Sequence, residues 1–275
     1  MSRPFTQVDV FGAAPYRGNP VAVVADAESL RDSEMQRFAS WTNLSETTFL
    51  LPTTTDAADY RVRIFTPTRE LPFAGHPTLG TAHAWLAAGG TPARADAIVQ
   101  ECAVGLVTVR RGDEGLAFAA PPLMRTGDVA EDLRQTLVRG LGLRPSDVVG
   151  MQWVDNGPGW VGVQLRSAGT VLAVEPDVAV LDGLNVGIVG AHTAGAPEAF
   201  EVRALASGGV EDPVTGSLNA GLAQWLIGSG QAPSRYRARQ GTRLGRYGVV
   251  SVEQLGDDIW VGGATVTCVT GTVDL

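Results

Sequence analysis

The chain has 275 residues, of which 44% are hydrophobic, and a formal net charge of −8 at pH 7. This composition excludes a disordered chain and provides a core for one large domain or for two of about 100 to 150 residues. Because the chain is acidic overall and contains no long run of basic residues, neither nucleic acid nor an anionic membrane is an expected partner.

All 21 basic residues are arginine, since the sequence contains no lysine. Schiff-base catalysis, a lysine-anchored pyridoxal phosphate and a Walker lysine are therefore excluded. Cys102 and Cys268 stand in separate β-branched apolar runs, so each is expected to be a reduced, buried core residue. These cysteines and the histidines His76, His83 and His192 show no metal-ligand spacing, so no metal site is expected.

The first residues, MSRPFTQVDVF, alternate like a strand and lack the apolar core of a signal peptide. The rest of the chain contains no run of about 18 apolar residues, which is the length needed to span a bilayer. We therefore expect a cytoplasmic protein.

The first half of the chain begins with strand-like segments. TQVDVF and VAVVA are expected to be two strands joined by a loop rich in glycine and proline. Apolar residues at helical spacing predict a helix over residues 29 to 43, and ETTFLLP and YRVRIF return to strand character. From AIVQECAVGLVTVRRGDEGLAFAAPP we expect another pair of strands. A first unit would then end near residue 122.

The segment GHPTLGTAHAWLAAGG predicts a helix. Pro77 suits the first helical position, which would place His76 at the N-cap. His76 is then either a simple cap or an acid/base group, although histidine is not a favoured cap residue. His83, two turns further along, is expected to be a packing or surface residue.

The second half carries a helix around EDLRQTLVRGLGL and strands at MQWV, WVGVQL, TVLAV, NVGIVGAH and FEVRALA. SGGVEDPVTGSLNAGLAQWLIGSG then predicts another helix, with Pro213 at its first position and Asp212 at its N-cap. Aspartate is a good structural cap. A structural and a functional role for Asp212 therefore both remain open.

The two helix segments resemble each other. Each combines an acid/base residue, a proline, a glycine and a small hydroxyl residue with an apolar helix that ends in glycine. DVFGAAPYRGNPVAVV in the first half has a weaker echo in VDNGPGWVGVQL. We predict two similar lobes, residues 1–122 and 123–264, with residues 265–275 returning to the first lobe.

Each predicted helix start presents unpaired backbone N–H groups and the positive end of a helix dipole, which attract anions. If the lobes face each other, both ends converge on one small acid. We therefore expect a carboxylate, sulfate or phosphate in an interlobe cleft, at the amides of residues 75–78 and 216–217.

Glu46 is a third candidate. The spacing from Asn43 to Glu46 suits a capping box, but the β-branched run TTFLL that follows predicts that Glu46 opens a strand. A carboxylate flanked by apolar residues is a candidate for a raised pKa. A structural and a catalytic role both remain open.

Three segments, NLSETTF (43–49), GHPTLG (75–80) and EDPVTGS (211–217), together with VDVFGAAPYRGNPVAVV, resemble signature segments of the PhzF-like isomerase family, relatives of diaminopimelate epimerase. The resemblance covers nearly the whole chain in order and spacing. It implies an α+β fold of two similar diaminopimelate epimerase-like lobes, each a barrel-like mixed sheet around a central helix. It also implies that the active site lies between the lobes.

The resemblance assigns roles to residues. It makes Glu46 the principal general acid/base, assisted by His76 and Asp212, which replace the pair of catalytic cysteines of the epimerases. A two-cysteine racemase mechanism is therefore disfavoured. Substrate-binding residues are implied at Asn19, Ser45, Gly75, Pro77, Thr78, Gly216 and Ser217.

The activity implied is a cofactor-independent isomerisation that moves a proton, with a double-bond shift, in a small unsaturated amino or hydroxy acid of secondary metabolism. The best-known reaction of the family isomerises trans-2,3-dihydro-3-hydroxyanthranilate on the way to phenazines. Two alternatives stay open, an amino-acid epimerase or racemase and a non-catalytic binding protein for small acids. The expected partners are a small carboxylate-bearing substrate and a second copy of the chain in a homodimer.

Overall fold

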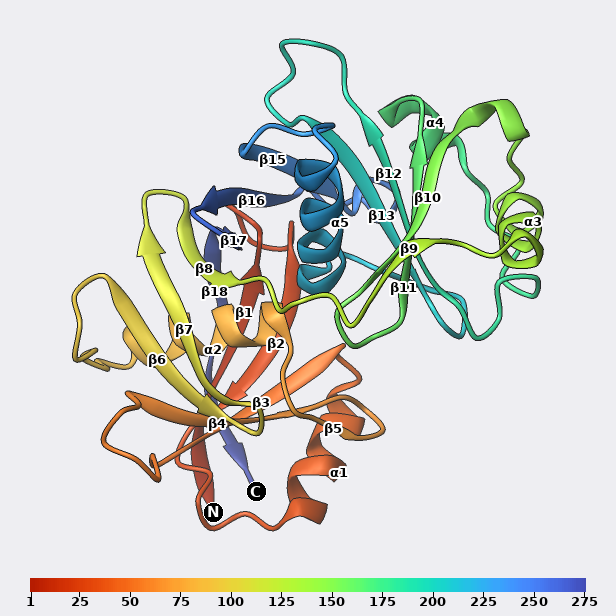
Figure 1. Cartoon of the computed structure of the whole chain (residues 1–275). Helices are drawn as coiled ribbons and strands as arrows, with labels where there is room; N and C mark the ends of the chain where they lie inside the picture. The colour runs from red at the N-terminus through yellow and green to blue at the C-terminus, as the bar shows by residue number, and fades with distance from the viewer. The chain divides into compact units, whose positions relative to one another are not determined.

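The computed structural model describes all residues, 1–275, and has a mixed α+β fold, which confirms the predicted class. Its contacts divide the chain into two compact units (Figure 1). Unit 1 comprises Met1–Ala119 and Gly262–Leu275, and unit 2 comprises Ala120–Val261. That each unit is an independent domain stays a prediction.

Unit 1 contains mixed β-structure whose strands are β1 (Ser2–Val10), β2 (Asn19–Val24), β3 (Glu46–Leu51), β4 (Tyr60–Phe65), β5 (Glu70–Leu71), β6 (Ala97–Cys102), β7 (Gly105–Gly112), β8 (Gly115–Ala119) and β18 (Thr265–Asp274). Neighbours pair in the order β18, β1, β2, β3, β4, β6, β7, β8, and β5 pairs with β4. The β2–β3 and β4–β6 pairs are parallel, and the others are antiparallel. The pairing of β18 with β1 brings the two chain ends together (Figure 1).

The predicted opening of unit 1 is confirmed, since β1 and β2 form an antiparallel pair across the glycine- and proline-rich loop. The pair of strands expected after residue 97 is instead three strands. A second tight turn between Gly112 and Gly115 separates β7 from β8, and Gly115 has a left-handed φ of 108° that glycine adopts easily.

Two helices belong to unit 1, α1 (Asp32–Thr42) and α2 (Gly75–Ala87). The helix predicted over residues 29 to 43 is confirmed, and it ends at Asn43 with a left-handed φ of 54°. Asn43 therefore closes one helix rather than opening another, and Glu46 opens β3 as predicted. Helix α2 packs against β1, β2, β3, β6, β7 and β8.

Unit 2 contains the strands β9 (Arg125–Asp128), β10 (Val148–Asp155), β11 (Trp160–Leu165), β12 (Asn185–Ala191), β13 (Phe200–Ala206), β14 (Val210–Asp212), β15 (Arg235–Gln240) and β16 (Gly248–Leu255), and β17 (Asp258–Gly263) runs on into unit 1. Neighbours pair in the order β9, β10, β11, β12, β13, β15, β16, and β14 pairs with β13. The β11–β12 and β13–β15 pairs are parallel.

The helices of unit 2 are α3 (Glu131–Gly140), α4 (Ala168–Ala173) and α5 (Gly216–Gly228), with 3₁₀ turns at Pro145–Asp147 and Thr242–Leu244. The strand predicted at TVLAV is wrong, because most of this segment lies in α4. The Ser167 hydroxyl caps that helix by accepting a hydrogen bond from the Thr170 amide, 3.1 Å away. A short apolar run cannot be assigned by periodicity alone, and the Ser167 cap is a local feature that favours the helix. No helix of either unit combines the length and apolar character required to cross a bilayer.

The two units share one order of pairings. Each has an antiparallel pair (β1–β2, β10–β11), then a parallel strand (β3, β12), an antiparallel strand (β4, β13) and a short hairpin strand (β5, β14). A long helix, α2 or α5, follows, and the next strand (β6, β15) pairs in parallel with the hairpin's first strand. That the units superpose stays a prediction.

Both long helices begin at other residues than predicted. Helix α2 starts at Gly75 with Ala74 as N-cap, so His76 is its second residue rather than its cap. Helix α5 starts at Gly216 with Thr215 as N-cap, and Asp212 is the last residue of β14. A proline is tolerated anywhere in the first turn or just before it, because no amide hydrogen is needed there. Proline therefore indicated two helix starts without fixing their first residues.

Two glycines let the long helices approach the strands closely. Gly80 and Gly221 are the sixth residues of α2 and α5. A Cβ atom at Gly80 would lie 2.3 Å from the Val21 side chain, and one at Gly221 would lie 2.3 Å from the Val154 carbonyl oxygen. Both distances are below van der Waals contact, so each helix depends on the missing side chain.

Cys102 and Cys268 are free thiols that are only partly buried, so the prediction of two core cysteines is wrong. Cys102 ends β6 at the turn into β7, where neighbouring residues are exposed. Cys268 lies in β18, which is nowhere fully buried. A β-branched run predicts a strand, but the position of that strand in the sheet decides its burial.

Candidate active site

Glu46 and His76 meet in unit 1. Glu46 is the first residue of β3, and its side chain is 15% exposed, whereas the side chain of His76 in α2 is 6% exposed. Nε2 of His76 lies 3.3 Å from Oε2 of Glu46. The fold therefore brings together two of the residues that the sequence singled out for acid/base chemistry.

Buried threonines tie β3 to α2 beside this pair. The Thr81 hydroxyl donates a hydrogen bond of 2.8 Å to the Thr48 hydroxyl, which donates to the Ala22 carbonyl of β2 at 3.3 Å. Both threonines are fully buried. Because Thr48 lies two residues after Glu46 and Thr81 lies in the second turn of α2, these bonds restrict the separation of Glu46 and His76.

The imidazole of His76 is neutral near pH 7. Burial lowers its pKa to about 3, and a hydrogen bond to the backbone of Pro20 acts in the opposite direction. Proline has no amide hydrogen, so its carbonyl is the acceptor. Nε2 has no hydrogen-bond partner, which assigns the bond with Pro20 to Nδ1. Nε2 therefore faces the Glu46 carboxyl as an unprotonated acceptor.

The start of α2 offers two backbone donors. The first amides of a helix have no acceptor within it, and Pro77, the third residue, has no amide hydrogen. The Thr78 amide donates to the carbonyl before the helix, and the Thr78 hydroxyl accepts a 3.0 Å bond from Gln100. The amides of Gly75 and His76 are therefore the donors that an anion could use at this end.

Asn19 and Ser45 are in different environments. Asn19 is fully buried and opens β2, whereas Ser45 is exposed directly before β3. The loop before Asn19 is held by the buried Asp9 carboxylate, which accepts hydrogen bonds from the amides of Arg17 at 2.7 Å and Gly18 at 2.8 Å. Asp9 thus fixes the entry into β2, which supplies the backbone contact to the imidazole.

Asp212 belongs to unit 2, where a hydrogen-bond network fixes it. The Thr215 hydroxyl donates to Oδ2 of Asp212 at 2.5 Å. Gln240 of β15 is fully buried, and its Nε2 donates to the Asp212 carbonyl at 3.1 Å and to the Thr215 hydroxyl at 3.0 Å. Oε1 of Gln240 accepts from the Thr215 amide at 3.1 Å and from Asn219 at 2.8 Å. Gln240 therefore holds the whole turn between β14 and α5.

Ser217, the second residue of α5, is held by the loop and strand that follow β10. The indole Nε1 of Trp160 donates a 3.0 Å hydrogen bond to the Ser217 hydroxyl oxygen. The Asn156 side chain donates to the Ser217 carbonyl at 2.9 Å. Gly216 is buried, and helix geometry leaves its amide and that of Ser217 without intrahelical acceptors.

An ion pair anchors the hairpin that carries Asp212. Arg203 of β13 donates two hydrogen bonds, of 3.0 and 2.9 Å, to the Glu211 carboxylate of β14. Its remaining Nη1 donates to the carbonyls of Val171 and Val174 at the end of α4. The Arg203 side chain is 3% exposed and that of Glu211 is 13% exposed, so this pair is buried.

His76 and Asp212 do not occupy corresponding positions, which corrects the pairing made from the sequence. His76 and Ser217 are each the second residue of their long helix. In the hairpins β4–β5 and β13–β14, the position of Asp212 corresponds to Leu71. The shared proline caused the error, because it lies inside α2 but before α5.

The remaining histidines serve other contacts. Both ring nitrogens of His83 lie 2.9 Å from hydroxyls of β18, those of Thr265 and Thr267, so His83 is a partly buried, hydrogen-bonded residue, which agrees with the expected packing or surface position. His192 lies 3.1 Å from the fully buried Glu201 in unit 2. No group of three or more His, Cys, Asp and Glu side chains is arranged to hold a metal ion.

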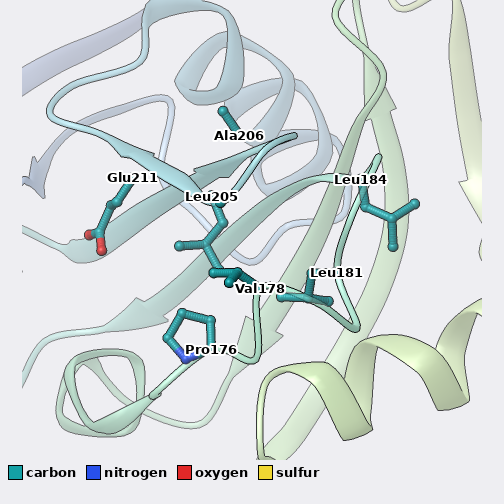
Figure 2. A pocket seen from close by; sticks show the side chains of 8 residues that line it. Pro176, Val178, Leu181, Leu184, Leu205, Ala206 and Glu211 are labelled. Atoms are coloured by element: carbon teal, nitrogen blue, oxygen red, sulfur yellow. The ribbon is translucent and has the colours of Figure 1, made fainter.

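A small cavity of about 90 Å³ lies in unit 2 (Figure 2). Val178, Leu181 and Leu205 gather at its centre, and the Glu211 carboxylate stands apart from them. None of the predicted site residues lines this cavity. Its one carboxylate is already paired with Arg203, so we assign it no catalytic role.

Several residues that shape these sites were not singled out from the sequence. Gln240 and Thr81 are polar residues in a strand and a helix, where a single sequence gives no sign of their partners. Trp160 had a signal, because it stands in VDNGPGWVGVQL, the segment that echoes the glycine- and proline-rich loop of the first half. The indole N–H of this tryptophan, a polar group that needs a partner when buried, is the signal that could have identified it.

Comparison with known proteins identifies the family. The family model described as phenazine biosynthesis-like protein (PhzC-PhzF) matches residues 8–271. The chain is 38% identical to antisense-enhancing sequence 1 of Schizosaccharomyces pombe over 97% of both chains. It is 34% identical to the trans-2,3-dihydro-3-hydroxyanthranilate isomerase of Pseudomonas chlororaphis over 98% of both chains.

A solved structure agrees with these relatives. The PhzF-family phenazine biosynthesis protein of Enterococcus faecalis matches with a TM-score of 0.83 and 25% identity over the full length of both chains. The chain therefore belongs to the phenazine biosynthesis-like family, as one of its isomerases.

Proposed function

We propose that the protein catalyses a cofactor-independent isomerisation of a small unsaturated amino or hydroxy acid, in which a proton moves between two carbons and the double bond shifts. The reaction named for the Pseudomonas chlororaphis relative, on trans-2,3-dihydro-3-hydroxyanthranilate, is the model for this proposal. A place in secondary metabolism is part of the same proposal.

The contact between Glu46 and His76 carries the proposal. The Glu46 carboxylate removes a proton from a carbon next to the π system, becomes a carboxylic acid, and returns the proton to another carbon. Nε2 of the neutral His76 ring, 3.3 Å away, accepts a hydrogen bond from the acid and stabilises it during the transfer. The mostly buried setting limits exchange of that proton with water.

The same contact favours isomerisation over a two-base epimerisation by these residues. An epimerase needs acid/base groups on opposite faces of one carbon. A substrate carbon cannot fit between two groups that lie 3.3 Å apart, so Glu46 and His76 act as one proton-carrying unit on one face. Epimerisation would need a second group from elsewhere.

Substrate binding is proposed at the two long-helix starts. Anions are attracted by the amides of Gly75 and His76 in α2, and by those of Gly216 and Ser217 in α5. Asp212 assists by binding an amino or hydroxyl group of the substrate. Asn19 and Ser45 are proposed as minor contacts.

Two proposals on architecture accompany this function. The shared order of pairings supports two copies of one barrel-like diaminopimelate epimerase-like fold, each around its long helix. The family resemblance supports a homodimer, and light scattering in dilute solution tests it.

Incubation with trans-2,3-dihydro-3-hydroxyanthranilate in deuterated water, followed by proton NMR, tests the function. Isomerisation predicts a product with a shifted double bond, whose new C–H position carries deuterium only to the extent that the proton on Glu46 exchanges with solvent, and no product with Glu46→Gln. Deuterium at an inverted centre with the double bond unmoved would support an epimerase. Binding without exchange would support the non-catalytic alternative.

A further inference from the structure

The hydrogen bond from Trp160 to Ser217 restricts the direction of the Ser217 hydroxyl at the start of α5. Trp160 opens β11 and is 4% exposed, and its indole Nε1 lies 3.0 Å from the Ser217 hydroxyl oxygen. An indole N–H can only donate. The bond therefore occupies a lone pair of the Ser217 oxygen and leaves the hydroxyl hydrogen for another acceptor.

Ser217 is placed to use that hydrogen on a ligand. It is only partly buried, whereas its neighbours Gly216 and Leu218 are buried. The amides at this helix end and the helix dipole attract a negative oxygen. The indole N–H excludes the orientation in which the hydroxyl hydrogen points toward Trp160, so the hydrogen is directed to the other side of the oxygen, where a carboxylate can accept it.

The backbone of Ser217 is fixed as well. Asn156, in the loop before Trp160, donates a 2.9 Å hydrogen bond to the Ser217 carbonyl. The side chain and the main chain of one residue are thus both held from the β10–β11 connection. Such a double restraint suits a residue whose hydroxyl must keep one direction.

We propose that Trp160 is a positioning residue that fixes the Ser217 hydroxyl as a donor to a substrate carboxylate, and thereby selects acids over their uncharged amides. This inference rests on the proposed function, because it assigns Ser217 to the substrate. Trp160 itself makes no contact with the substrate. Its effect is transmitted through one hydrogen bond.

The test compares anthranilate with anthranilamide as ligands, each titrated by NMR. Trp160→Phe keeps most of the ring and removes the N–H. We expect about 5- to 10-fold weaker binding of anthranilate and less than about twofold change for anthranilamide. Turnover should show a raised KM with little change in kcat.

Trp225→Phe is the matched control, because Trp225 is also buried in unit 2 and lies two turns further along α5. It should leave the binding of both ligands unchanged. Equal losses in the two variants, or equal losses for the two ligands in Trp160→Phe, would show a purely structural role and overturn the proposal.

A double variant isolates the hydrogen bond. Ser217→Ala should weaken anthranilate binding, and Trp160→Phe added to it should cause no further loss. Additive losses contradict the proposal. If Trp160→Phe does not fold, the Trp160 indole N–H resonance in Ser217→Ala replaces it, and an unmoved resonance would contradict the hydrogen bond.

The binding arm separates this inference from the proposed function. Intact, Trp160-dependent binding of anthranilate without turnover would end the isomerase proposal and leave the role of Trp160 standing. If the protein turns over its substrate and the Trp160→Phe variant binds anthranilate normally, the isomerase proposal stands and the role of Trp160 is overturned. Failure of the wild-type protein to bind anthranilate would overturn the role of Ser217 as its donor.

Discussion

The starts of α2 and α5 are built on one plan and carry different chemistry. In each unit, the second residue of the long helix is contacted from the start of a neighbouring strand, His76 by Pro20 of β2 and Ser217 by Trp160 of β11. The first residue of the parallel strand is Glu46 in unit 1 and Asn185 in unit 2. Unit 1 thus combines a carboxyl group with an imidazole, where unit 2 has an amide and a hydroxyl.

This difference shows that two units with the same order of strand pairings can carry residues of different chemical roles at corresponding positions. Asn185 uses its side chain within unit 2, donating to the Pro158 carbonyl and accepting from the Ser207 amide. It is a structural residue at a position where unit 1 has an acid/base candidate. We therefore propose that proton transfer is carried out by residues of unit 1, and that Asp212 and the hydrogen-bond donors of unit 2 serve substrate binding.

The largest effect is expected from Glu46→Gln, which keeps the size of the side chain and removes the base. Turnover should fall by about 10⁴-fold, because general acid/base catalysis is typically worth about 10² to 10⁴ and Glu46 is the proposed sole carrier. Anthranilate binding should persist. Steady-state kinetics and NMR titration measure the two quantities.

His76→Asn and Asp212→Asn should each cost less than Glu46→Gln, because both residues are proposed to assist. If Glu46→Gln keeps more than about a tenth of the rate while His76→Asn abolishes it, the roles are reversed and the histidine is the base. If Asp212→Asn is the most damaging variant, the division of work between the units is wrong.

The ion pairs of the hairpins β4–β5 and β13–β14 allow the two units to be compared by their contribution to stability. Arg63 and Glu70 of β4 and β5 form the same bidentate pair as Arg203 and Glu211, but their side chains are 24% and 37% exposed. Removing one partner of a buried pair typically costs about 3 to 5 kcal/mol, and of an exposed pair about 0 to 1 kcal/mol. Glu211→Gln should therefore lower the free energy of unfolding far more than Glu70→Gln.

Chemical denaturation measures both variants. Equal losses would mean that the burial of Arg203 does not determine the strength of its pair. A large loss of unfolding free energy in Glu70→Gln alone would instead show that the β4–β5 hairpin depends more on its ion pair than the β13–β14 hairpin does.

The segments that carry the candidate site residues could be predicted from the sequence, whereas the arrangement of those residues in space could not. Glu46 as the start of a strand and the two long helices could be predicted, because β-branched runs and apolar periodicity are local signals. The exact position of His76 could not, because a proline marks a helix start only to within a turn. The contact between Glu46 and His76 depends on the parallel pairing of β2 with β3 and on the Thr81–Thr48 bond, which join residues distant in the chain.

A smaller effect is expected at the glycines that bring each long helix against its strands. A Cβ at Gly221 would lie 2.3 Å from the backbone oxygen of Val154, whereas one at Gly80 would meet the side chain of Val21 at the same distance. Overpacking typically costs about 1 to 3 kcal/mol. Since a backbone carbonyl cannot rotate away, Gly221→Ala should destabilise more than Gly80→Ala in denaturation experiments. The reverse order would show that α2 is held more rigidly than α5.

The smallest effect concerns the pH dependence of stability in unit 1, where Ser217 gives α5 no titrating counterpart. Burial lowers the pKa of His76 from 6.5 to about 3 in the folded protein. Between these values the unfolded chain binds the proton and the folded protein does not, so stability falls as the pH drops below 6.5. From pH 7.0 to 5.5, the loss due to His76 should be about 1 kcal/mol.

His76→Asn removes this titration, so its free energy of unfolding should fall less steeply over the same range. Urea denaturation of both proteins at several pH values measures the difference. If the two curves stay parallel, the imidazole has an ordinary pKa in the folded protein. It would then be partly charged near neutrality, and Nε2 could not serve as the neutral acceptor for the Glu46 carboxylic acid.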